Sequence, residues 1–336
     1  MKIAIIKHSV TISPTGGVKV QAEMWKKGLE SKGHQVTLIN IWDTNDWKAF
    51  DVIIILEHEG NMLGYVKYIA PANPNIVLAP IIDTLESPRI ITVKSKYKLI
   101  HKLFSMFHRG YALNNIVDTK KLIKGYLVRS EYEKKYLLSL GISQDRIFNV
   151  PLNYRVIPPR EMPQKENYVF LACLLADKRK NVERLIKAAK KYKFHLMLAG
   201  ALRNDSEKKW LYDLKGDSSN IEYLGRVSDE ELFNLYRRAK VFALPSINEG
   251  VGMVALEAAT FGCEIVLTNT GAPKSYYNGM AQLVNPYSID SIGRAILKVL
   301  NGEYSSQPNL RDYIINNYNE SHCMDLLEKS LLEILK

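Results

Sequence analysis

The chain has 336 residues, of which 46% are hydrophobic and 24% are charged, values that are ordinary for a globular protein of about two domains. No apolar run approaches the roughly 20 residues that a bilayer-spanning helix requires. The net charge of +11 favours anionic partners, but charge alone does not choose among nucleic acid, anionic lipid and phosphate-bearing substrates.

The cysteines and the first residues bear on the cellular compartment. Cys173, Cys263 and Cys323 are scattered in apolar surroundings, which is typical of reduced core thiols. Residues 1–6 have the length of a strand and lack the longer apolar core and the cleavage site of a signal peptide. We therefore expect a cytosolic protein, and the absence of any Cys/His cluster with metal-ligand spacing predicts no bound metal.

The first third of the chain alternates short apolar strands with helical segments. This alternation predicts a parallel sheet with helices on both faces, and ligands at the carboxyl ends of its strands. In the loop that follows the first strand, Gly16 and Gly17 allow a phosphate to approach the backbone, although a plain turn is the alternative. The predicted strands are 2–6, 35–39, 52–56 and 76–82, and the first helix is 18–32.

A basic segment follows, over residues 89–124. Nine lysines and arginines alternate there with aromatic residues, and Leu99, Leu103, Phe104 and Phe107 share one helical face. Such a helix can lie on an anionic membrane surface. The alternative is a solvated basic face whose apolar side packs on the domain core, and nucleic acid is the third choice because no reader motif accompanies the charge.

The end of the first domain is marked by a strand, a helix and a second strand. The strands are predicted at 125–130 and 146–152, and the helix at 131–140 is terminated by Gly141. Prolines at 151, 158 and 159 stiffen the exit from the second strand. We place the linker near residues 153–166, so that the first domain is 1–153.

The second domain begins with a predicted strand at 168–174 and a basic turn. Lys178, Arg179 and Lys180 stand together in this turn, before a helix at 182–191. Three cations at one strand-to-helix turn repel one another unless an anion lies there. Further strands are predicted at 194–199, 221–224, 265–267 and 282–284.

The most informative stretch is 246–258, which follows a buried strand at 241–244 and leads into a helix. A glycine-containing turn before a helix presents unpaired backbone N–H groups and the positive end of the helix dipole, which together bind phosphate. Glu249 and Glu257, eight positions apart, can accept hydrogen bonds from hydroxyl groups. The predicted ligand has hydroxyls on both sides of its phosphates, as a nucleotide sugar does. The alternative is a capped helix with a solvated Glu257.

The residues Pro245-Ser246, Glu249-Gly250-Val251-Gly252, Glu257-Ala258, Gly262 to Val266 and Gly271-Ala272 resemble the motif series of the retaining family-4 glycosyltransferases. This resemblance implies an α/β protein of the GT-B fold, with two Rossmann-like domains and a cleft between them. The acceptor-binding domain would be 1–153 and the nucleotide-sugar-binding domain 154–308. A C-terminal helix over 309–336 would pack back on the first domain.

The resemblance also implies roles for individual residues. Lys180 would bind donor phosphate, with Lys178 or Arg179 replacing an arginine that the family carries earlier. Asp83 or His58 would replace the family's histidine beside the transferred sugar. Glu249 would hold the sugar hydroxyls, Glu257 the ribose, and Arg226 the base. The remaining donor contacts would be Gly16, Gly17, Arg179, Gly250, Val251, Gly252 and Met253.

The predicted activity is therefore transfer of a sugar from a nucleotide sugar to a glycan or lipid-linked acceptor, with retention of configuration implied by the resemblance alone. No metal or cofactor is expected, because no Asp-x-Asp motif occurs in a suitable context. Two alternatives stay open: a GT-B-like sugar-nucleotide epimerase, and a non-catalytic nucleotide-sugar-binding subunit. A cytoplasmic protein of cell-envelope polysaccharide synthesis, peripheral to the membrane and without nucleic acid, fits these expectations.

Overall fold

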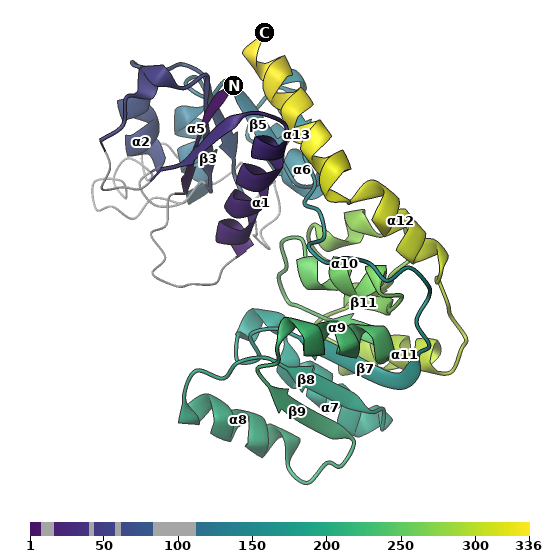
Figure 1. Cartoon of the computed structure of the whole chain (residues 1–336). Coiled ribbons are helices and arrows are strands. Elements are labelled where there is room, and N and C mark those ends of the chain that lie inside the picture. The colour runs from purple at the N-terminus through teal and green to yellow at the C-terminus, as the bar shows by residue number, and fades with distance from the viewer. Residues whose placement is uncertain (8–16, 40–43, 58–61, 83–111) are drawn as a thin grey trace. The chain divides into compact units, whose positions relative to one another are not determined.

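The computed structural model describes residues 1–7, 17–39, 44–57, 62–82 and 112–336 (Figure 1). Contacts divide the chain into two compact units. The first unit holds Met1–Ile82, the described residues up to Leu152, and Glu320–Lys336, and the second holds Asn153–Asn319. Each unit has a six-stranded sheet in which every pair of neighbouring strands is parallel.

The first unit has the strand order β2-β1-β3-β4-β5-β6. Its strands form where the sequence is apolar and β-branched, and all five residues of β3, Val52–Leu56, are buried. The strands are β1 Lys2–Lys7, β2 Gln35–Leu38, β3 Val52–Leu56, β4 Ile76–Ala79, β5 Gly125–Val128 and β6 Ile147–Asn149. The helices are α1 Gly17–Ser31, α2 Met62–Ile69, α5 Ala112–Thr119, α6 Glu131–Ser139 and α13 Glu320–Leu335, with single turns Trp47–Ala49 and Gln144–Arg146.

The second unit has the strand order β12-β11-β10-β7-β8-β9. The strands are β7 Glu166–Ala172, β8 Leu196–Ala199, β9 Ile221–Gly225, β10 Ala239–Leu244, β11 Glu264–Thr268 and β12 Gln282–Val284. The helices are α7 Val182–Tyr192, α8 Asp205–Lys215, α9 Asp229–Arg238, α10 Met253–Thr260, α11 Ile289–Leu300 and α12 Asn309–Asn317, with single turns η3 Lys178–Lys180 and η4 Pro273–Tyr276.

The order of strands in the second unit determines where a ligand can bind. From β7 the chain moves outward through β8 to β9, then returns to β10 and moves the other way to β12. Because such crossovers are right-handed, the helices that follow β7 and β10 lie on opposite faces of the sheet. The chain therefore leaves these two neighbouring strands toward opposite faces of the sheet, and the crevice at such a switch point is the usual ligand site of an open parallel sheet.

The C-terminal segment differs from the single helix expected over 309–336. It forms two helices, α12 in the second unit and α13 in the first, separated by Tyr318 and Asn319. The helix α12 packs on α10, and α13 packs on α1, where a Cβ on Gly28 would lie 2.3 Å from Cγ of Met324. Asparagines at 316, 317 and 319 interrupt the helical pattern, since their side chains compete for backbone hydrogen bonds.

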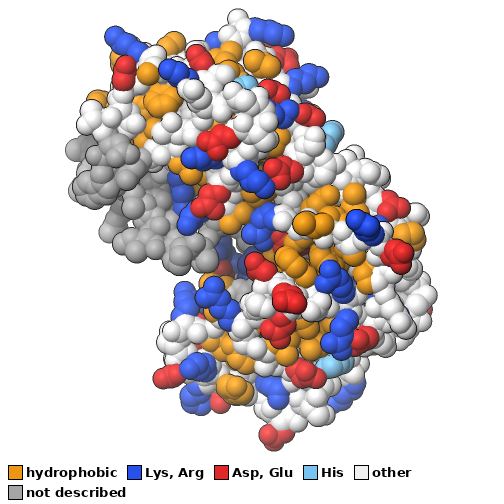
Figure 2. All heavy atoms as spheres, in the orientation of Figure 1, with side chains coloured by type: hydrophobic (Ala, Val, Ile, Leu, Met, Phe, Trp, Pro, Cys, Tyr) orange, Lys and Arg blue, Asp and Glu red, His pale blue; other side chains and the backbone are white. Residues whose placement is uncertain are grey.

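Basic and acidic side chains alternate over the described surface that Figure 2 shows, so the positive net charge is not gathered there in one patch. None of the helices in the described part of the chain is both long and apolar enough to cross a membrane. The predicted membrane-surface helix within 89–124 lies largely outside the described residues, and this interpretation stays a prediction.

Candidate active site

Two loops meet at the switch point of the second sheet. The loop after β7 contains η3, and the loop after β10 begins at Pro245 and ends where α10 starts. The amide of Ile247 donates to the carbonyl of Arg179 at 2.8 Å, which ties one loop to the other. The basic turn, residues 178–180, and the glutamate motif, residues 246–258, are therefore neighbours in the structure although they lie far apart in the sequence.

Lys180 and Glu249 form an ion pair at this point. The Lys180 ammonium lies 2.7 Å from Oε2 of Glu249, and the Ser246 hydroxyl donates to the same oxygen at 2.9 Å. Both side chains are largely buried, with exposed fractions of 22% for Lys180 and 11% for Glu249. As far as the described residues go, Oε1 of Glu249 and two ammonium protons of Lys180 remain for a ligand. The pair can thus hold an anion and a hydroxyl group at once.

Asn181 holds this arrangement in place. Its backbone is left-handed, with φ of 60°, and its buried side-chain amide donates to the carbonyls of Pro245 at 2.9 Å and Pro286 at 2.7 Å. Arg184 in turn donates to the Asn181 side-chain oxygen. The resemblance implied that Lys180 binds donor phosphate, which stays a prediction, and the hydrogen bonds of Asn181 position the loop that carries Lys180.

We expect Asn181→Ala to lower the free energy of unfolding by about 2 kcal/mol or more, because two buried carbonyls lose their donor. Denaturant titration of the full chain measures this loss. Asn181→Gly is the matched control, since it relieves the left-handed backbone without restoring the hydrogen bonds. Equal stability of Asn181→Ala and the wild type would contradict the role given to this side chain.

The start of α10 completes the site. Gly252 precedes the helix with φ of 72°, and no side chain caps the first turn. The N–H groups of Met253 and Val254 have no acceptor within the helix, because the first amides of any helix lack one. A Cβ on Gly271 would lie 3.0 Å from the Glu249 carbonyl oxygen, so the Gly271 loop approaches this turn closely. The geometry suits a phosphate group beside Lys180.

The crowding of three cations is relieved largely by the protein itself. Arg179 is paired with Asp177 at 2.7 Å, and Lys180 with Glu249. Burial alone would raise the pKa of Asp177, but the hydrogen bonds and the charge of Arg179 hold this pKa below its usual value. The anion predicted from the sequence is thus partly supplied by two carboxylates, and the engagement of Arg179 leaves its predicted donor contact a prediction.

Glu257 lies in a different environment from Glu249. Its carboxylate is 2% exposed and accepts a hydrogen bond of 2.6 Å from Nε of Arg155, which lies in the segment before β7. Burial raises the pKa of Glu257, and Arg155 opposes this shift. Binding of a ribose by Glu257 stays a prediction, and it requires Arg155 to share or release the carboxylate. Nothing in the local sequence around Arg155 indicated this partner.

The other predicted site residues are partly outside the described residues. Gly17 is exposed as the first residue of α1, and Arg226 is exposed directly after β9. Gly16, His58 and Asp83 lie outside the described residues. The predicted roles of these five residues stay predictions.

The chain is similar in sequence to known proteins. The chain matches the family described as Glycosyl transferases group 1 over residues 156–320. An uncharacterised glycosyltransferase of Methanocaldococcus jannaschii is 31% identical, in an alignment that covers 100% of this chain and 98% of the relative. The chain belongs to the group 1 glycosyltransferases. The resemblance to glycosyltransferases seen in the sequence is thereby confirmed.

Two further similarities bear on this group 1 glycosyltransferase. The O-antigen chain mannosyltransferase B of Escherichia coli is 27% identical over 56% of this chain and 54% of its own length. The solved structure of the lipopolysaccharide outer core galactosyltransferase WaaB superposes with a TM-score of 0.64 at 16% identity, covering 99% of each chain. This structural similarity confirms the predicted GT-B fold.

Proposed function

We propose that this glycosyltransferase transfers a hexose from a nucleotide sugar to a glycan or lipid-linked acceptor in cell-envelope polysaccharide synthesis. The observation that carries the proposal is the Lys180–Glu249 pair at the switch point of the second sheet, beside the uncapped start of α10. The similarity to an O-antigen mannosyltransferase supports a polysaccharide product.

The proposed chemistry follows from the charges at this site. The bond between the anomeric carbon and the phosphate oxygen breaks, and its electron pair passes to the diphosphate. The acceptor oxygen bonds to the anomeric carbon, and its proton passes to the departing diphosphate. The Lys180 ammonium and the amides of Gly250 to Met253 stabilise the growing negative charge. Oε1 of Glu249 accepts hydrogen bonds from the sugar hydroxyls and orients the ring. Retention of configuration and independence of metal are parts of the proposal.

The test is a panel of nucleotide sugars assayed for nucleoside diphosphate release with and without lipid-linked oligosaccharide acceptors. We expect release to rise with one donor and one acceptor class, and NMR of the product to show the donor's anomeric configuration. A nucleotide sugar that is converted to its epimer without acceptor would contradict the proposal and favour the epimerase. Binding of a donor without turnover under any acceptor would favour a non-catalytic subunit.

A further inference from the structure

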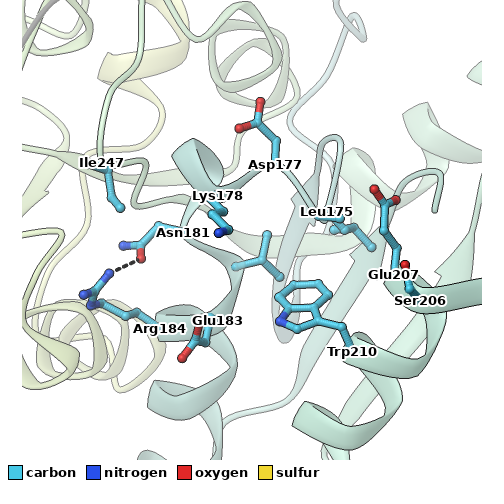
Figure 3. Close-up of a pocket in the computed structure, with 12 residues that line it drawn as sticks. Leu175, Asp177, Lys178, Asn181, Glu183, Arg184, Ser206, Glu207, Trp210 and Ile247 are labelled. Atoms are coloured by element: carbon cyan, nitrogen blue, oxygen red, sulfur yellow. Dashed lines mark hydrogen bonds between the residues drawn. The ribbon is translucent and has the colours of Figure 1, made fainter. Parts of the chain in front are cut away.

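The second unit has a cavity where α7 and α8 begin, which we call the second cavity to distinguish it from the donor site (Figure 3). Its volume is about 440 Å³, which is within the range of small-molecule sites. Lys178, Arg184, Glu207 and Trp210 are among the side chains that line it. Neither Lys180 nor Glu249 lines this cavity, although Asn181 and Ile247, which belong to the two loops of the proposed donor site, do.

The basic turn η3 separates the two sites. A 3₁₀ turn has three residues per turn, so side chains two positions apart project about 120° from each other. The Lys180 ammonium lies against Glu249, whereas Lys178 lines the second cavity. One turn thus presents a cation to each site.

The acidic side chains of this cavity are already neutralised. Asp177 is paired with Arg179, and Glu207 with Arg203 at 2.6 Å. Glu183 is paired with Lys187 at 2.5 Å. Each acid therefore has a cation of its own, and the cations that line the cavity itself are not needed to balance these acids.

Two of the cations that line the cavity have a positive charge that the described part of the protein does not neutralise. The Lys178 ammonium has neither an acceptor nor an ion-pair partner in the part of the chain that the structure describes. Arg184 donates to the neutral amide oxygen of Asn181 and lies over the ring of Tyr287 at 5.5 Å, contacts that orient it without cancelling its charge. The cavity therefore favours an anionic ligand.

The remaining lining residues suit a sugar ring. The indole of Trp210 offers a flat apolar surface, beside the buried side chains of Leu175 and Val182. Figure 3 shows Glu207 and Ser206 on one side of this indole and Lys178 on the other. Carboxylate and hydroxyl oxygens can accept from several sugar hydroxyls, whereas a nucleobase carries few such donors.

From these features we propose that the cavity binds a hexose phosphate. The sugar ring stacks on Trp210, with its hydroxyls toward Glu207 and Ser206, and the phosphate lies between Lys178 and Arg184. This ligand is distinct from the donor at Lys180 and Glu249, and its binding does not depend on the transferase reaction.

Isothermal titration of the full chain with mannose 1-phosphate and with glucose 1-phosphate tests the proposal. We expect at least one of them to bind, and its Kd to rise at least about tenfold in Lys178→Ala and in Trp210→Ala. Lys209→Ala, on the same helix as Trp210 but paired with Asp213 outside the cavity, is the matched control and should bind as the wild type does. Trp210→Phe keeps an aromatic ring and should lose less than Trp210→Ala.

Further binding measurements distinguish this site from the donor site. Glu249→Gln should leave the Kd unchanged, and free mannose and inorganic phosphate should each bind at least about tenfold more weakly than the hexose phosphate. Quenching of tryptophan fluorescence by the ligand should disappear in Trp210→Phe. The proposal is overturned if neither hexose phosphate binds at millimolar concentration, if Lys178→Ala and Trp210→Ala both bind like the wild type, if Glu249→Gln abolishes binding, or if uridine monophosphate competes for the same site and binds more tightly.

Discussion

Replacing Lys180 with alanine is expected to lower kcat/KM at least about tenfold, a loss of about 1.4 kcal/mol or more of transition-state stabilisation. The variant removes the ammonium that lies 2.7 Å from Glu249 and that faces the proposed position of the leaving diphosphate. We expect the same minimum loss in Glu249→Ala, because the sugar hydroxyls lose their acceptor. Steady-state assays with the donor identified by the nucleotide-sugar panel measure both losses.

Because Lys180 and Glu249 form an ion pair, we expect the losses in kcat/KM of the two single variants not to be additive. Removing either partner also disturbs the other, since Lys180 and Ser246 share one oxygen of Glu249. The double variant should therefore lose less than the product of the two single losses. Lys180→Arg should recover part of the activity because it keeps the charge, and Lys209→Ala should be fully active. Wild-type rates in both single variants would remove the basis of the proposed mechanism.

Arg155→Ala is expected to lower the free energy of unfolding by about 2 kcal/mol near pH 7.5, because the buried Glu257 carboxylate loses its counter-ion. A fully buried pair would lose more, but the Arg155 side chain is 39% exposed and water already weakens its attraction. Thermal and denaturant unfolding of the full chain measure the loss. The double variant Arg155→Ala/Glu257→Gln is the control, since it removes the unpaired charge and should recover stability.

This loss should depend on pH in a defined direction. Burial already raises the folded-state pKa of Glu257 above its unfolded value, against the opposing charge of Arg155. Without Arg155 the pKa rises further, so the folded variant binds more protons than the unfolded chain and its stability falls as pH rises through that pKa. The deficit of Arg155→Ala should thus shrink from about pH 7.5 to about pH 5. A deficit that is constant or grows on acidification would show that Glu257 is not the cause.

Features of the fold that depend on neighbouring residues could be predicted from the sequence. The apolar runs at 52–56 and 241–244 became the buried strands β3 and β10, because a parallel strand covered on both faces needs an unbroken apolar run. The start of α9 is local in the same way, since the Ser228 hydroxyl accepts a hydrogen bond from the backbone amide of Glu231 at 3.2 Å. These features depend on neighbours within a few residues of one another.

The chemistry of the glutamate motif was local as well. A strand at 241–244, followed by a glycine turn and a helix start within 246–258, predicts an anion site wherever the rest of the chain lies. Membership of the glycosyltransferases was indicated by this motif series, and the comparison with relatives confirmed it.

Pairings between distant residues were decided by the tertiary structure alone. Lys180 is 69 residues from Glu249, and Arg155 is 102 residues from Glu257. The switch in strand order between β7 and β10 brings the first pair together, and the entry of the chain into β7 brings the second. A sequence shows which side chains carry charge, but the neutralisation of a charge depends on which loops the sheet order places side by side. The sequence therefore could not show that Glu249 lies against Lys180 while Lys178 lines the second cavity, and the phosphate predicted beside Lys180 stays a prediction.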